Sequence, residues 1–219
     1  MAAFPLLVFD LDGTLIDSLP DLAAALNRLL IERGFAPLLP AEVAAMVGDG
    51  TRRLVERAFA ARGRTAQEED LRQFLADYTA HAAIATRPYP QVIETLSALR
   101  SAGWHFAICT NKTVAATNVV LRALNLGSWF TAIGGGDSFT AHKPNAIHLQ
   151  GTIAAAGGDP KRTIMTGDHA NDIAVAKGTG VPSIFAAWGY GAPSMAQGAS
   201  AVARRFAELA SIAPRLLAS

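Results

Sequence analysis

The chain has 219 residues, of which 51% are hydrophobic and 17% charged, and its formal net charge is +1. These values predict a folded protein with one full hydrophobic core and room for a smaller domain, and they argue against disorder. The near-neutral charge lacks the basic excess of a nucleic-acid-binding protein. No apolar run approaches the roughly 18 residues that cross a bilayer, and the N-terminus lacks a signal-peptide pattern. We therefore expect no nucleic-acid or membrane partner and a cytoplasmic location.

Short apolar segments alternate with helical segments along most of the chain. In chain order, the apolar segments predict strands at residues 6–9, 105–109, 131–133, 163–166 and 182–185. Helical spacing predicts helices at residues 92–100, 114–124, 146–156, 172–177 and 206–217. This alternation is typical of an α/β fold with a doubly wound, mainly parallel, Rossmann-like sheet. Polar residues that follow the strands would gather at the carboxyl edge of that sheet, where such folds bind ligands.

One interval interrupts the alternation. Between residues 16 and 86 no strand pattern is found, only helical pattern such as the apolar spacing within residues 71–78. We therefore predict an α/β core made of residues 1–15 and 86–219, with an inserted all-helical cap at residues 16–85. An insertion directly after the first strand would lie over the carboxyl edge of the sheet as a lid.

Two aspartates stand at the end of the first predicted strand. Asp10 and Asp12 point the same way, because side chains two residues apart on an extended chain share a face, and Gly13 lets the backbone turn away. Burying a carboxylate without a partner costs several kcal/mol, so the pattern indicates a site. One carboxylate could attack while the other transfers a proton. Taken alone, a strand-end turn with two solvated acids is the alternative.

Further polar residues follow other predicted strands. Thr110 and Asn111 precede a helix whose free N–H groups suit an anion, although both residue types are also common N-caps. Lys143 lies in a loop before another helix, and Asp168 and Asp172 follow the strand at residues 163–166. Three acids converging in one crevice need a cation. Oxygen ligands without a His or Cys set favour Mg²⁺ over zinc.

Taken in order, these motifs resemble those of the haloacid dehalogenase superfamily of phosphotransferases, and the resemblance covers nearly the whole chain. They occupy residues 10–14, 110–111, 143–144 and 167–172. The resemblance implies that Asp10 attacks phosphorus and forms an aspartyl-phosphate, while Asp12 transfers the proton. It also implies that Lys143 offsets the negative charge and that Thr110 and Asn111 hold the transferring oxygens. A Mg²⁺ ion would be held by the carboxylates of Asp10 and Asp168, the Asp12 carbonyl and, in support, Asp172.

The segment VGDGTRRLVERAF at residues 47–59 and several core segments are similar to the phosphoglycolate phosphatases of this superfamily. The expected partner is therefore a small-molecule phosphate monoester, with 2-phosphoglycolate favoured. Gly50, Thr51 and Arg52 of the predicted cap are candidate substrate-binding residues, since glycine permits close backbone approach and arginine could pair with a substrate carboxylate. A solvated helix start is the alternative for these three residues.

Related functions differ in the residues they require. A dehalogenase would lack the second acid, so Asp12 argues against it, and a phosphonate hydrolase would need a cap lysine, which residues 16–85 do not contain. A sugar-phosphate phosphatase, a phosphomutase and, from another class, a phosphoacceptor signalling domain remain open. The resemblance fits a monomer or a homodimer. Cys109 is expected to be buried, and neither His142 nor His169 is expected to be a ligand.

Overall fold

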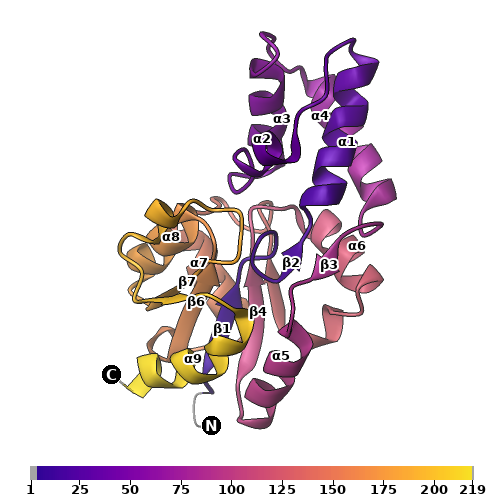
Figure 1. The fold of residues 1–219 in the computed structure, drawn as a ribbon. Coiled ribbons are helices and arrows are strands. Elements are labelled where there is room, and N and C mark those ends of the chain that lie inside the picture. Colours follow the sequence, from indigo (N-terminus) through magenta and orange to yellow (C-terminus); the bar gives the residue numbers. More distant parts are fainter. Residues whose placement is uncertain (1–3, 219) are drawn as a thin grey trace.

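The computed structural model describes residues 4–218 and contains one six-stranded parallel sheet in the order β5-β4-β1-β6-β7-β8 (Figure 1). The strands are β1 (Leu6–Phe9), β4 (His105–Cys109), β5 (Ala132–Gly134), β6 (Thr163–Gly167), β7 (Ser183–Ala186) and β8 (Ala201–Ala203). Strand β1 pairs with β4 on one side and with β6 on the other, so the strand order runs outward from β1 in both directions. The carboxyl end of β1 is therefore the topological switch point at which such sheets bind ligands.

Alternate residues of β1 face opposite layers of helices. Leu7 and Phe9 pack with α5 (Val92–Ser101) and α9 (Leu209–Ala218), whereas Leu6 and Val8 pack with α7 (Ala146–Ala155) and α8 (Ala170–Thr179). The strand is therefore apolar at every position, as expected for a parallel strand buried on both faces. The helices of the core are α5 (Val92–Ser101), α6 (Val114–Ala123), α7 (Ala146–Ala155), α8 (Ala170–Thr179) and α9 (Leu209–Ala218). Short 3-10 turns lie at Gly127–Trp129, Pro160–Arg162, Pro193–Ala196 and Phe206–Glu208.

The predicted α/β class is confirmed, with small shifts in the bounds. The strands expected at residues 6–9 and 105–109 are found as predicted, and the other expected strands differ by one residue at one or both ends. The strand β8 was not predicted, because its three residues are too few to show a periodic pattern. The helix expected at residues 172–177 begins earlier, at Ala170, and Cys109 is buried as expected.

Four helices gather above the carboxyl edge of the sheet (Figure 1). They are α1 (Leu19–Glu32), α2 (Pro40–Ala44), α3 (Thr51–Ala60) and α4 (Glu68–His81), called here the α1–α4 segment. They pack around a hydrophobic cluster that includes the buried Leu26, Phe59 and Phe74, and Ala116 of the core helix α6 also belongs to it. The four helices therefore share an apolar interior and also contact α6.

The expectation that residues 16–86 contain no strand was wrong at residues 16 and 17. Strand β2 (Ile16–Asp17) pairs antiparallel with β3 (Arg87–Pro88), with Ile16 opposite Pro88. Two-residue strands are too short to alternate visibly, and this pair joins positions far apart in the sequence. The ribbon of β2 and β3 forms the connection between the α1–α4 segment and the core.

Candidate active site

Asp10 follows β1 directly and is buried beside a lysine and another acid. The Lys143 Nζ lies 2.9 Å from Asp10 Oδ1 and donates to Asp172 Oδ1 at 2.6 Å. Lys143 is only 1% exposed, so its charge is neutralised by these two carboxylates rather than by water. They hold the pKa of Lys143 above its ordinary value, although burial alone would lower it.

Asp10, Asp168 and Asp172 form a buried group of carboxylates. Each offers an oxygen that lies within 4.8 Å of the others. Asp168 accepts from the Thr14 hydroxyl at 2.9 Å and from the Tyr190 N–H at 2.8 Å. Burial first, and then repulsion from Asp10 and Asp172, raises the pKa of Asp168 to about 7. The group could hold a metal ion, because a divalent cation would relieve this repulsion.

Asp12 lies outside that carboxylate group and has different partners. Its two oxygens accept from Lys112 Nζ at 3.0 and 2.8 Å, and Oδ1 also accepts from the Ser18 hydroxyl at 2.6 Å. The neighbouring acids Asp10 and Asp12 therefore sit in two separate hydrogen-bond environments.

The contact between Lys112 and Asp12 was not predicted, and it places a buried positive charge in the segment that follows β4. Lys112 is 5% exposed, and Asp12 holds the pKa of its ammonium above the ordinary value, although burial opposes the charge. The signal was available in the sequence, because Lys112 comes shortly after a strand that ends at the same edge as β1.

Thr110 and Asn111 meet the other predicted residues at this edge. Thr110 is buried, and its hydroxyl accepts from the Lys112 N–H at 3.3 Å. The Asn111 side chain donates to the carbonyls of Gly48 and Lys143, both at 3.1 Å, and so links the α1–α4 segment to the core. At Gly50, with φ +87°, a Cβ atom would lie 3.2 Å from the Asn111 carbonyl. Glycine at this position allows the loop before α3 to approach the core closely.

A cavity lies between the α1–α4 segment and the carboxyl edge of the sheet. Its lining includes Asp10, Asp12, Thr110, Asn111 and Lys112 from the core, and Leu22, Val47, Gly48, Gly50, Thr51 and Leu54 from the insertion. Gly50 and Thr51 are therefore close to the two acids. Arg52 is not part of this lining. Its side chain is 57% exposed and pairs with Glu68.

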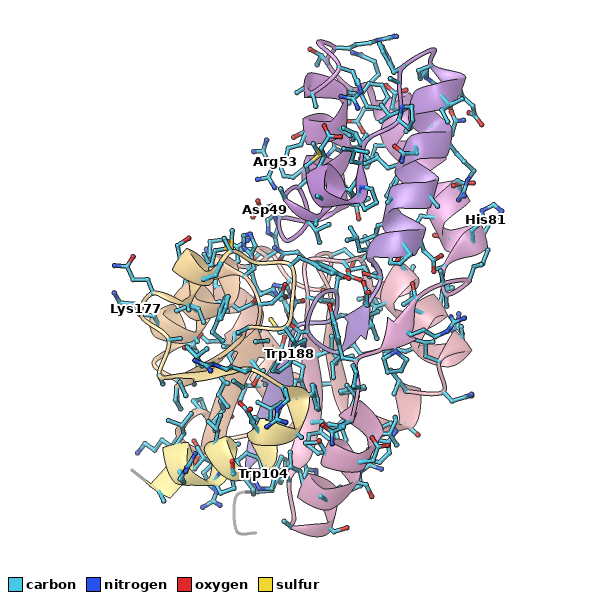
Figure 2. The ribbon with its side chains drawn as sticks, in the orientation of Figure 1. Asp49, Arg53, His81, Trp104, Lys177 and Trp188 are labelled. Atoms are coloured by element: carbon cyan, nitrogen blue, oxygen red, sulfur yellow. The ribbon has the colours of Figure 1, made fainter. Side chains whose placement is uncertain are left out.

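The loop before α3 is held against the core by polar contacts. Figure 2 shows Asp49 at the edge of the insertion that faces the core, while Arg53 points outward. Asp49 accepts hydrogen bonds from Asn171 and from Arg57. These two contacts hold the pKa of the Asp49 carboxyl below its usual range, although burial alone would raise it.

Histidines support the site without joining the carboxylate group. His169 is the N-cap of α8 and accepts from the Asn171 N–H at 3.3 Å. His142 Nδ1 lies 2.9 Å from the Lys143 carbonyl. His148 was not among the predicted site residues. It accepts from the Lys143 N–H at 2.9 Å and donates to the Gly134 carbonyl at 3.1 Å. It thereby fixes the loop that carries Lys143.

None of the helices in residues 4–218 has the length and apolar character that a membrane span requires.

The comparison with known proteins agrees with this geometry. Residues 7–186 match the family described as haloacid dehalogenase-like hydrolase. A phosphoglycolate phosphatase of Agrobacterium fabrum is 44% identical over 85% of this chain and 82% of its own. One from Caulobacter vibrioides is 40% identical over 84% and 79%. A crystal structure of a predicted phosphoglycolate phosphatase from Haemophilus somnus superposes with a TM-score of 0.88 at 31% identity, covering 97% of this chain and 99% of that one. The chain belongs to the haloacid dehalogenase-like hydrolase family.

Proposed function

We propose that this chain is a magnesium-dependent phosphatase that hydrolyses 2-phosphoglycolate to glycolate and inorganic phosphate. The observation that carries the proposal is the separation of two neighbouring acids. Asp10 lies with Lys143, Asp168 and Asp172, whereas Asp12 contacts Lys112 and Ser18. Two carboxylates in unlike environments can take the unlike tasks of nucleophile and proton carrier.

In the first step, a carboxylate oxygen of Asp10 bonds to phosphorus while the bond to the ester oxygen breaks. Asp12, which enters this step protonated, gives its proton to that oxygen, and the alcohol leaves. Asp12 then takes a proton from water, the water oxygen attacks phosphorus, and the bond to Asp10 breaks to release inorganic phosphate. The Thr110 hydroxyl and the Asn111 backbone N–H hold the transferring oxygens during both steps.

Charge repulsion is the main obstacle to the first step. Two like charges 4 Å apart repel by about 4 kcal/mol at an effective dielectric constant of 20. The Lys143 ammonium, 2.9 Å from Asp10, reduces this repulsion. The carboxylates of Asp10, Asp168 and Asp172 fit Mg²⁺, because they are hard oxygen donors whose mutual repulsion exceeds what one lysine balances. Asp12 would add its backbone carbonyl to this set. When bound, the ion would supply positive charge against the phosphate oxygens.

The insertion would act as a lid on this chemistry. We assign residues 16–85 to a cap domain and residues 1–15 and 86–219 to the core, supported by the hydrophobic cluster of the α1–α4 segment, to which the core adds only Ala116 among the buried residues. Gly50 and Thr51, which line the cavity, would contact substrate through their backbone. Substrate binding by Arg52 stays a prediction, since the guanidinium pairs with Glu68 in this conformation.

The test is a panel of phosphate monoesters given to the purified protein, with release of inorganic phosphate as the readout. The panel contains 2-phosphoglycolate, several sugar phosphates and ethyl phosphate. With Mg²⁺ present, we expect the highest kcat/KM for 2-phosphoglycolate. EDTA should abolish turnover, Mg²⁺ should restore it, and Ca²⁺ should inhibit because its coordination is longer and looser.

Each alternative function predicts a different result in the same assay. A sugar phosphate as the best substrate would replace the proposed one. Isomerised sugar phosphate without free phosphate would indicate a mutase, and a single phosphorylation without turnover would indicate a signalling domain. Full activity in metal-free buffer would contradict the role of Mg²⁺.

A further inference from the structure

Lys112 places a buried positive charge on the side of Asp12 that borders the cavity. Its ammonium contacts both Asp12 oxygens and lies 4.5 Å from the centre of the Tyr78 ring on α4. The insertion contributes apolar side chains to the cavity wall, including Leu22, Val47 and Leu54. Lys112 is the cation among the residues that line this cavity, whereas Lys143 faces Asp10 and Asp172.

The covalent structure of a short substrate limits where its second anionic group can lie. The proposed function puts the ester oxygen in contact with Asp12, which must protonate it. In 2-phosphoglycolate the carboxylate carbon is two bonds from that oxygen, so the carboxylate lies within about 3–4 Å of it by ordinary bond lengths. A residue that recognises this carboxylate must therefore lie next to Asp12.

We infer that Lys112 is a specificity-determining residue that binds the carboxylate of the leaving group and so selects phosphate esters with an anionic alcohol. This inference rests on the proposed function for the position of the ester oxygen. Lys112 meets the distance requirement, because its Nζ lies 2.8 Å from Asp12. Arg52 does not, because its exposed side chain turns to Glu68 and does not line the cavity.

A second explanation of the same contact makes a different prediction. If Lys112 only holds Asp12 in place, its loss should weaken turnover of every substrate equally and should not change the preference for a carboxylate. Ligand binding, measured without turnover, separates the two explanations.

The experiment compares the binding of two phosphonates by titration calorimetry with Mg²⁺ present. The first, 3-phosphonopropionate, carries a carboxylate at the position found in 2-phosphoglycolate, and the second, propylphosphonate, does not. A charge-assisted hydrogen bond predicts that the wild-type protein binds the first about 10- to 150-fold more tightly. In Lys112→Met this ratio should fall toward one, and in Lys112→Arg, which keeps the charge, part of it should remain.

Two further variants serve as comparisons. Lys177→Met removes a lysine that Figure 2 shows on the core away from the insertion, and it should keep the wild-type ratio. Arg52→Ala tests the competing candidate, because the ratio should fall in this variant instead if Arg52 binds the carboxylate. Binding of propylphosphonate to Lys112→Met shows that the variant is folded with its phosphate site intact. If Lys112→Met binds neither ligand, Lys112→Arg decides: a ratio below the wild-type value but above one supports the inference, and an unchanged ratio or a ratio of one contradicts it.

The inference is overturned if Lys112→Met keeps the wild-type ratio, if the ratio collapses in Arg52→Ala instead, or if the wild-type protein shows no preference. The proposed function fails separately, when another monoester in the substrate panel is hydrolysed best. In that case the ratio of the two phosphonate affinities still tests the contact between Lys112 and a carboxylate.

Discussion

His148 is a fully buried histidine whose two ring nitrogens both make hydrogen bonds with the backbone. One accepts from the Lys143 N–H and the other donates to the Gly134 carbonyl, so the ring is neutral. Burial first, and then the nearby Lys143 ammonium, lowers the pKa of His148 to about 4. The fold therefore disfavours a protonated imidazole at this position.

This lowered pKa predicts a loss of stability in acid. Below a pH of about 6.5 the unfolded chain binds a proton at His148, whereas the folded chain binds one there only near pH 4. The free energy of unfolding should therefore fall as the pH drops through this window. Between pH 7 and pH 5, urea titrations should show the wild-type protein losing about 2 kcal/mol more than His148→Gln.

Because the two proteins differ only at residue 148, the difference between their pH dependences reports the contribution of that histidine. An equal loss in His148→Gln and the wild-type protein would mean that the neutral state of His148 does not shape the acid stability.

At the scale of elements, the loop after β7 ties the start of α1 to the carboxylate group. The Tyr190 hydroxyl accepts from the N–H groups of Ser18 and Leu19, at 2.7 and 3.0 Å, and donates to Asp17 at 2.8 Å. The backbone N–H of the same residue donates to Asp168 at 2.8 Å. One residue therefore connects the β2–α1 junction with an acid of the site.

Removing this hydroxyl should weaken the junction. Tyr190→Phe takes away the acceptor of the buried Ser18 N–H and one of two acceptors of the Leu19 N–H. An unsatisfied buried donor costs about 1–3 kcal/mol, so the free energy of unfolding in urea should fall by that amount. A variant as stable as the wild-type protein would show that water or a rearranged backbone satisfies these groups.

The central strands of the fold are easier to predict from the sequence than the short peripheral ones. β1 and β4 are apolar at nearly every position because they are buried on both faces, and such runs can be recognised without partners. The ribbon of β2 and β3 was missed because it consists of two residues on each side and forms only when distant segments meet.

The residues of the site also differ in how well the sequence predicts their contacts. That Asp10, Asp168 and Asp172 converge with Lys143 follows from the rule that parallel strands end at one edge, and the structure brings them together as predicted. The partner of Asp12 could not be chosen in advance, because a long lysine side chain can reach several groups around a strand end. Which way Arg52 turns depends on Glu68, at the start of another helix.

At the scale of the whole molecule, two parts of the chain line the cavity. The carboxyl edge of the sheet supplies Asp10, Asp12 and Lys112, and the α1–α4 segment supplies the opposite wall (Figure 1). The Asn111 side chain bridges the two by donating to both Gly48 and Lys143.

Acid quenching of the reaction tests most directly whether Asp10 becomes phosphorylated during turnover. The wild-type protein, mixed with Mg²⁺ and 2-phosphoglycolate carrying labelled phosphate and quenched within milliseconds, should carry the label on the peptide that contains Asp10. Asp12→Asn should still be labelled by para-nitrophenyl phosphate, whose leaving group needs no proton, and Asp10→Asn should show neither label nor turnover. Turnover above a few per cent of wild type in Asp10→Asn, or label on another residue, would contradict the assignment of Asp10 as the nucleophile.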